Sequence, residues 1–138
     1  MNAIIINACL GILYQAGSDE VLLASRPEGK VLAGHWEFPG GKLESGEDAF
    51  TALARELNEE LGIIVKTDDM RLIGNVEHQY PHGLARLDLI VIKQWDGDIQ
   101  ALEGQQFCWC NLNNNIRPEP LLPTTMQIFE LIKTIRLN

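Results

Sequence analysis

The sequence predicts an α/β domain in which strands and helices alternate along one chain. An uncharged apolar run extends from Ala3 to Tyr14, as in a buried strand. Apolar residues recur at helical spacing in two segments, from Gly46 to Leu61 and from Thr124 to Ile135. The 138 residues suit a single domain, residues 1–138, which would bury roughly two-thirds of its unfolded surface.

The N-terminal third predicts two strands and a long loop. The first strand, Ala3 to Tyr14, is rich in isoleucine and leucine, so we expect both of its faces to be buried. A turn at Gln15 to Asp19 leads to a second strand, Val21 to Ser25. The segment Arg26 to Gly34 is a loop that could close over a ligand. The chain then passes through Trp36–Phe38 into Pro39–Gly41, where glycines permit conformations that a side chain would forbid.

The helix predicted from Gly46 to Leu61 has signals at both ends. Ser45 is the expected N-cap, with Asp48 three residues later in a capping-box spacing. Gly62 stands where a left-handed residue would end the helix. The face expected to be buried comprises Phe50, Leu53, Ala54, Leu57 and Leu61.

The C-terminal half predicts three more strands and the closing helix. The strands are expected at Met70–Tyr80, Leu84–Trp95 and Gln105–Leu112, with turns at Pro81–Gly83 and Asp96–Asp98. A polar loop, Asn113–Pro120, precedes the helix Thr124–Ile135. Its inner side is expected to hold Met126, Ile128, Phe129, Leu131, Ile132 and Ile135.

Composition and charge exclude several classes of partner. The chain is 46% hydrophobic and 22% charged, which is typical of a globular protein. Its net charge of −8 and its lack of a basic stripe argue against binding to a nucleic-acid polymer. The apolar run Ala3–Tyr14 is too short to span a membrane and lacks the features of a signal peptide. A monomer is plausible, although the sequence does not determine the oligomeric state.

Three cysteines cannot form a closed disulfide framework. Cys108 and Cys110 flank one residue, so on a strand both would point to the same face. The histidines do not complete a zinc site with them. We therefore expect reduced structural thiols and a cytoplasmic compartment.

Glu56, Glu59 and Glu60 crowd the last turn of the predicted helix. Residues three or four apart face each other, so Glu56 repels both of the others by about 0.2–0.5 kcal/mol per exposed pair. The carbonyl end of the helix adds a penalty of roughly 0.3–1 kcal/mol per anion. A hard divalent cation would reverse these effects, because carboxylate oxygens are the ligands that Mg²⁺ and Mn²⁺ prefer.

The residues around this cluster form a longer motif. Gly41 and Glu47 are separated by five residues, and seven more lead to Arg55–Ile63, R-E-L-N-E-E-L-G-I. All nine defined positions of the Nudix box are matched over 23 residues, so the chain resembles a Nudix hydrolase of the MutT branch. The similarity extends to Trp36–Lys42, to Glu103–Gln105 with Trp109, and to Pro120–Pro123.

The resemblance implies a fold and a reaction. The Nudix fold is a mixed, curved β-sheet sandwiched between α-helices. MutT enzymes cut nucleoside triphosphates to the monophosphate and pyrophosphate with Mg²⁺ or Mn²⁺, water attacking the β-phosphorus. By motif position the metal ligands are Glu56, Glu59, Glu60, Glu103 and the carbonyl of Gly40. Arg55 orients Glu56 through a charge-assisted hydrogen bond, Glu47 braces the loop or a water of the metal shell, and the general base is Glu56 or Glu103.

The same resemblance implies the substrate-binding residues. Arg26 matches an arginine that contacts the phosphates, and Phe38 and Tyr80 match aromatic residues that line the base pocket. MutT carries an asparagine two residues after the proline equivalent to Pro123, where it reads oxidised guanine. This chain has Thr125 there, with one hydroxyl in place of an amide donor and acceptor.

The substrate expected from the resemblance is 8-oxo-dGTP, whose removal would serve DNA replication and repair. One alternative is an enzyme that acts on CTP or a modified pyrimidine nucleotide. Another is a non-catalytic Nudix domain that only binds a nucleotide, although every carboxylate of the box is present. A calcium-binding module is excluded because the D-x-[DN]-x-[DN]-G loop is absent.

Overall fold

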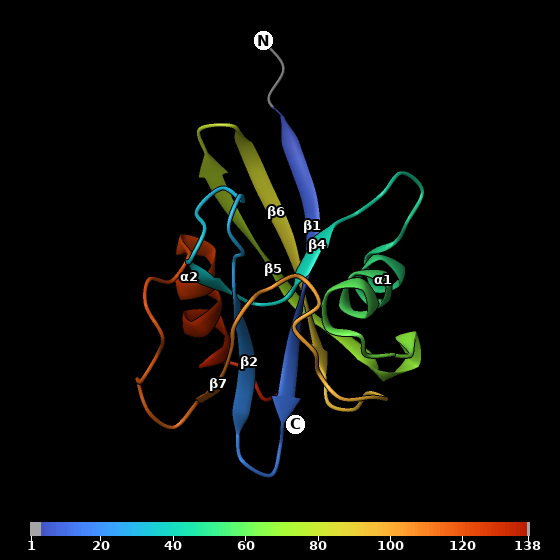
Figure 1. Ribbon diagram of the computed structural model, residues 1–138, viewed down its shortest axis with the longest axis vertical. Helices are drawn as coiled ribbons and strands as arrows, with labels where there is room; N and C mark the ends of the chain where they lie inside the picture. Colours follow the sequence, from blue (N-terminus) through green and yellow to red (C-terminus); the bar gives the residue numbers. More distant parts are fainter. Residues whose placement is uncertain (1–3, 138) are drawn as a thin grey trace.

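The computed structural model describes residues 4–137 and contains a mixed sheet between two α-helices (Figure 1). In chain order the elements are β1 (Ile5–Gln15), β2 (Glu20–Ser25), β3 (Trp36–Glu37), β4 (Gly40–Lys42), α1 (Ala49–Leu61), the 3₁₀ turn η1 (Thr67–Asp69), β5 (Met70–Tyr80), β6 (Gly83–Ile92), β7 (Phe107–Asn111) and α2 (Pro123–Ile132). Ala3, the first residue of the first predicted strand, lies outside the described residues.

Strand β1 is the centre of the sheet. The strand order is β3-β2-β1-β6-β5, with β4 paired to β1 and β7 paired to β2. β1 runs parallel to β6, from Ile5 opposite Leu84 to Leu13 opposite Ile92. The other strand pairs are antiparallel. The predicted mixed sheet is therefore confirmed.

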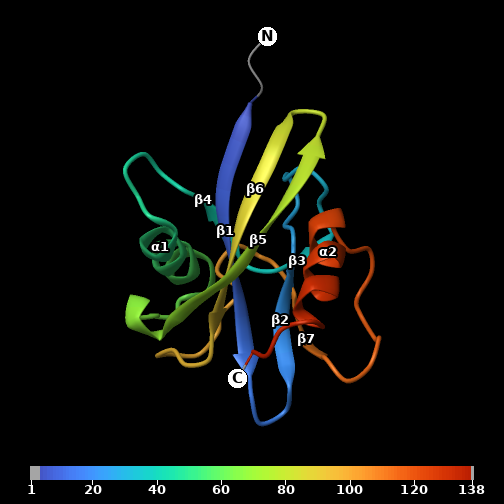
Figure 2. The same ribbon diagram turned by 180° about the vertical axis from the view of Figure 1, so that it is seen from behind.

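The two faces of the sheet carry separate cores. On β1, Cys9 and Leu13 pack in the cluster beneath α1, whereas Leu10 and Ile12 pack in the cluster beneath α2. The helices accordingly lie on opposite sides of the sheet (Figures 1 and 2). Burial on both faces is confirmed for the second half of β1 but is wrong for its start, where Ile5 is 45% exposed.

The helix predicted from Gly46 to Leu61 begins three residues later than predicted. α1 begins at Ala49, and Asp48 is the N-cap, its carboxylate accepting from the Thr51 N–H at 2.8 Å. Gly46 is left-handed, with φ +82°, and so cannot continue a helix. Gly62 ends the helix in the left-handed conformation with φ +71°, which confirms the predicted C-terminus.

Smaller differences concern other boundaries. β5 has the predicted limits, whereas the other predicted strands shift at one or both ends, and the short strands β3 and β4 were not predicted. β6 ends at Ile92 because the chain turns away, and Asp96 instead bridges Ile64. The last helix ends at Ile132 rather than Ile135, and Met126, expected on its inner side, is 57% exposed. Buried Thr124 and Thr125 occupy that side with Ile128, Phe129 and Ile132.

Cys108 and Cys110 lie on the same face of β7, as their spacing predicts. Their sulfur atoms are 3.9 Å apart, and both thiols are free. Burial raises the pKa of the Cys110 thiol to about 12, so it stays protonated at neutral pH. Within residues 4–137, neither α-helix has the length and apolar character needed to cross a membrane.

The observed N-cap generates a stability prediction. Asp48→Ala should lower the free energy of unfolding by about 1 kcal/mol, because the Thr51 N–H loses its acceptor. Ser45→Ala is the matched control and should change it by less than about 0.5 kcal/mol. Urea denaturation of both variants measures the difference, and a larger loss in Ser45→Ala would contradict the assigned cap.

Candidate active site

Arg55 organises the acidic residues around the start and middle of α1. Its Nε and Nη2 donate to the two carboxylate oxygens of Glu47, each at 2.8 Å. Its Nη1 donates to Glu56 at 3.0 Å, and Nη2 also reaches the Lys42 carbonyl at 3.2 Å. The Arg55 guanidinium holds the pKa of Glu47 down at about 2. Arg55 therefore joins the loop, strand β4 and the helix, and it donates a hydrogen bond to Glu56, while its role in catalysis stays a prediction.

Glycines allow β4 to lie against α1. A Cβ atom on Gly41 would be 2.4 Å from the Glu56 carboxyl carbon, and one on Gly40 would be 2.0 Å from the Cys9 carbonyl oxygen. Gly40 also has φ +154°, at the edge of the region that favours glycine. The two glycines thus place the main chain of β4 directly beside the Glu56 carboxylate.

Glu60 is the most perturbed acid of the candidate site. Burial raises its pKa, and the charges of Glu56, Glu103 and Glu37 raise it further, to about 9. These acids come from α1, from the loop before β7 and from β3. Four carboxylates from three separate segments therefore share one neighbourhood, and Glu60 stays protonated at neutral pH when no cation is present.

The loop that carries Glu103 is tied to the end of α1 by Gln105. The buried Gln105 side chain accepts from the Glu103 N–H at 2.9 Å and donates to the Glu60 carbonyl at 3.1 Å. The Leu102 N–H donates to the same carbonyl at 3.2 Å. The sequence predicts no such role for Gln105. Its only signal is a polar residue that follows the motif residue Gly104 directly before a strand.

Glu59 is less closely associated with the other acids. Its side chain is 55% exposed and lies 3.4 Å from Arg55. Within residues 4–137, no three acidic, histidine or cysteine side chains are already arranged around a common metal position. The donor set nevertheless suits a hard divalent cation, since it consists of carboxylate oxygens and includes a buried acid whose ionisation a cation would favour. The metal-ligand roles of Glu56, Glu59, Glu60, Glu103 and Gly40 stay predictions.

The three residues predicted to contact the base lie in different environments. Phe38 is fully buried, and its ring centre is 5.3 Å from that of Phe129. Thr125 is 1% exposed, and its hydroxyl donates to the Trp36 carbonyl at 2.9 Å. Tyr80 is partly exposed, with its ring between those of His78 and His82. In this conformation the Thr125 hydroxyl is already used within the protein, and only Tyr80 of the three reaches the surface.

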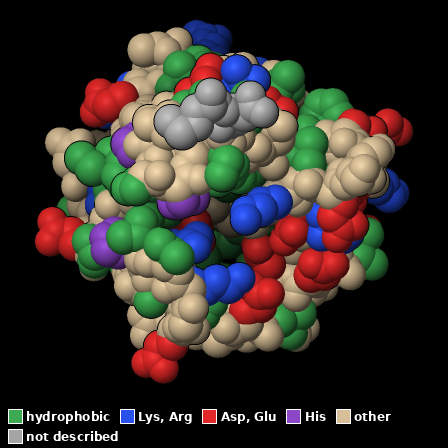
Figure 3. Space-filling model, turned by 90° about the horizontal axis from the view of Figure 1, so that it is seen from above, with side chains coloured by type: hydrophobic (Ala, Val, Ile, Leu, Met, Phe, Trp, Pro, Cys, Tyr) green, Lys and Arg blue, Asp and Glu red, His purple; other side chains and the backbone are tan. Residues whose placement is uncertain are grey.

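The molecular surface carries acids beside a hollow. Seen from the end where β1 begins, acidic side chains gather along one side of a central depression, and Lys or Arg side chains stand next to them (Figure 3). A cavity of about 680 Å³ lies between the β4–α1 loop and the sheet, where Lys42, Glu47, Asn75 and Asp88 contribute to its lining. Of the predicted catalytic residues, none lines that cavity.

Comparisons with known proteins agree with this geometry. The family described as "NUDIX domain" matches residues 7–131. The chain is 37% identical to an 8-oxo-dGTP diphosphatase of Proteus vulgaris over 62% of this chain and 75% of that protein. It is 32% identical to the CTP pyrophosphohydrolase of Escherichia coli (strain K12) over 85% of this chain and 84% of that protein. The crystal structure of a MutT NUDIX hydrolase from Burkholderia pseudomallei superposes with a TM-score of 0.80 at 24% identity, covering 92% of this chain and 97% of the other, and so shares the fold.

The raised pKa of Glu60 generates a prediction for the metal-free protein. A carboxyl whose pKa rises on folding stabilises the folded state at low pH, and this contribution is lost as the pH increases from 4.5 to about 9. Glu60→Gln should therefore flatten the dependence of stability on pH over that range. Near the upper end of this pH range, the free energy of unfolding of the variant should exceed that of the wild type by on the order of 1 kcal/mol. Denaturant titrations with a chelator present measure this.

Glu59→Gln is the matched control, because Glu59 is exposed and adjoins Glu60 in the sequence. Its stability should follow the wild-type dependence on pH. A Glu60→Gln curve parallel to the wild type would contradict the assigned burial of the Glu60 carboxyl.

Proposed function

The chain belongs to the Nudix hydrolase family, and from that membership we propose that it is a nucleoside triphosphate pyrophosphohydrolase dependent on Mg²⁺ or Mn²⁺. It converts a nucleoside triphosphate and water to the monophosphate and pyrophosphate. The observation that carries the proposal is the set of acids around Glu60, which burial and mutual repulsion make unfavourable unless a cation joins them.

The proposed metal site uses oxygen atoms from three parts of the chain. Glu56 and Glu60 supply carboxylates from α1, Glu103 supplies one from its loop, and Glu59 and the Gly40 carbonyl complete the set. Bound there, the cation neutralises phosphate charge and promotes attack by water. Arg55 holds Glu56 in place, while Gln105 holds the Glu103 loop against the end of α1.

Of the two candidate bases, we favour Glu103. Glu56 accepts a charge-assisted hydrogen bond from Arg55 at 3.0 Å, so one of its carboxylate oxygens is already engaged within the protein. The contact described for Glu103 is made by its backbone N–H, which leaves its carboxylate available. Glu56 is then chiefly a metal ligand, and Glu103 is the group that accepts a proton from water.

We propose 8-oxo-dGTP as the substrate, with Arg26 on the phosphates and Tyr80 on the base. Phe38 and Thr125 support the base pocket from beneath, because both are buried. Removal of this nucleotide would protect DNA replication and assist repair from a cytoplasmic location. The protein would act on a small-molecule nucleotide as a single-domain monomer.

A pyrimidine nucleotide such as CTP is the second candidate. The observation that favours it is the Thr125 hydroxyl, whose proton is donated to the Trp36 carbonyl and so is not available to oxidised guanine. The similarity to a CTP pyrophosphohydrolase also covers more of the chain than the similarity to the Proteus vulgaris protein.

Removal of metal and of single carboxylates tests the reaction. A chelator should abolish pyrophosphate release, and Glu56→Gln should lower kcat by roughly 10²-fold or more. Glu103→Gln should lower kcat far more than it raises KM, since its proposed role is in proton transfer. Glu119→Gln, in the loop before α2, is a control that should retain activity. Full activity in Glu56→Gln would rule out the proposed mechanism.

A substrate panel with two variants at one position tests the base preference. We expect a higher kcat/KM for 8-oxo-dGTP than for dGTP. Thr125→Asn should widen that ratio, because a carboxamide can bond Trp36 and still offer a second polar atom. Thr125→Val should leave the ratio unchanged and lower stability by about 1 kcal/mol through the lost hydrogen bond. If CTP is hydrolysed best and Thr125→Asn leaves the guanine ratio unchanged, the second candidate replaces the first.

A further inference from the structure

Arg26 is the first residue after strand β2 and begins the loop that leads to β3. Its backbone closes that loop: its N–H donates to the His35 carbonyl at 2.8 Å, and its carbonyl accepts from the Gly34 N–H at 2.9 Å. Its side-chain Nε donates to the Val31 carbonyl at 2.6 Å, within the same loop. The guanidinium is thus oriented by the loop along one edge.

Glu37 holds a second edge of the same guanidinium. It lies on β3 opposite Ala24 of β2, so Arg26, two residues beyond Ala24, is its diagonal neighbour. Arg26 Nη1 lies 3.1 and 3.2 Å from the two Glu37 carboxylate oxygens. Each side chain is about one-quarter exposed, 26% for Arg26 and 25% for Glu37. The pair is therefore shielded on most sides and still reachable from solvent.

Within residues 4–137, no contact is described for the third edge of the guanidinium. Among the contacts of residues 4–137, Nε and Nη1 of Arg26 are engaged, whereas Nη2 has no described partner. Arginine has a planar fork of five donors, so fixing Nε and Nη1 determines where the Nη2 hydrogens point. A free pair of donors on an immobilised cation is suited to a phosphate oxygen.

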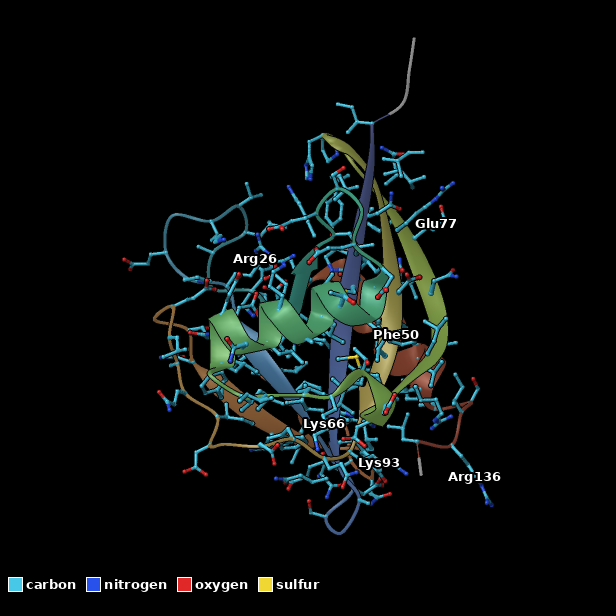
Figure 4. All side chains as sticks on the ribbon, turned by 90° about the vertical axis from the view of Figure 1, so that its right-hand side faces the viewer. Arg26, Phe50, Lys66, Glu77, Lys93 and Arg136 are labelled. Atoms are coloured by element: carbon cyan, nitrogen blue, oxygen red, sulfur yellow. The ribbon has the colours of Figure 1, made fainter. Side chains whose placement is uncertain are left out.

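Glu37 also lies near the acids of the candidate metal site. Its charge contributes to the raised pKa of Glu60, after the effects of burial, Glu56 and Glu103. A carboxylate placed there adds to the repulsion among those acids, and Arg26 is its direct ion-pair partner. In Figure 4, Arg26 lies above the C-terminal half of α1, the half that carries these acids.

We propose that Glu37 is a positioning residue for substrate phosphate, which it serves by fixing the Arg26 guanidinium with Nη2 free beside the acidic site. This inference rests on the proposed nucleoside triphosphate substrate. Glu37 itself repels phosphate and makes no contact with it. Its effect passes through Arg26, so removing its charge weakens substrate binding even though an anion has been taken away.

A purely structural ion pair predicts different kinetics. If Glu37 only stabilised the loop, Glu37→Gln would lower stability and leave the KM of folded enzyme unchanged. If its charge acted on the phosphates directly, Glu37→Gln would lower KM by removing repulsion. Only the positioning role predicts that KM rises and that the rise requires Arg26.

The test compares kcat and KM of four proteins on the nucleoside triphosphate that the wild type hydrolyses best. Glu37→Gln should raise KM about tenfold and change kcat by less than about threefold, because phosphate binding rather than proton transfer is affected. Arg26→Gln should raise KM at least as much. The double variant should match Arg26→Gln alone, since Glu37 acts through that arginine. Effects that multiply in the double variant, or a KM unchanged or lowered in Glu37→Gln, would overturn the proposal.

Glu77→Gln is the matched control. Glu77 pairs with Arg86 at 3.4 Å on β5 and β6, and it lies well away from Arg26 in Figure 4. Its KM should equal that of the wild type. If Glu37→Gln does not fold, Glu37→Asp, which retains the charge on a shorter side chain, should show the rise in KM to a smaller extent, and a wild-type KM would refute the role.

Inorganic tripolyphosphate separates this inference from the proposed function. If the wild type hydrolyses no nucleoside triphosphate, the proposed function fails. Calorimetric binding of tripolyphosphate with Mg²⁺ then decides the inference. Weaker binding by Glu37→Gln than by wild type and Glu77→Gln supports the positioning role, and equal binding by all three refutes it.

Discussion

The bonds from Arg55 to Glu47 and Glu56 are the interaction on which the rest of the site depends. The β4–α1 loop and the helix bring together acids that repel one another, and Arg55 is the cation that lies among them. It bonds Glu47 through two nitrogens, binds Glu56 through the third, and also reaches the Lys42 carbonyl. One side chain thereby sets the position of the loop, of β4 and of the Glu56 carboxylate.

Local sequence signals predicted much of the fold but not every boundary. The C-terminal end of α1 and the limits of β5 were predictable because a left-handed glycine and strand alternation act over a few residues. The N-cap was not, because Glu47, which would have been in the first predicted turn, bonds Arg55 and the Glu44 N–H instead. The position of Glu47 therefore depends on Arg55, about two turns further along the chain, whereas capping rules consider only the first turn of a helix.

Motif position predicted the candidate acids, whereas their surroundings required the structure. The convergence of Glu103 and Glu37 on Glu60 depends on how the β7 loop and β3 meet α1, and it leaves no periodic signal in the sequence. The burial of Phe38 and Thr125 also depends on how distant segments pack together, so the sequence alone did not predict it. Thr125 differs from the residue expected at its position, and the structure gives its hydroxyl a role in joining α2 to β3. A substitution that suggested altered recognition therefore has a packing explanation as well.

The parallel pairing of β1 with β6 has a consequence for synthesis of the protein. Ile5 pairs with Leu84, which lies about 80 residues later in the chain. Strand β1 can therefore pair with β6 only after most of the chain has been synthesised. Until then α1 has no complete sheet on which to bury Leu53, Leu57 and Leu61. The acidic residues on the polar face of α1 would then keep the incomplete chain soluble. The same charges that disfavour the folded apoprotein would protect the unfinished chain from aggregation.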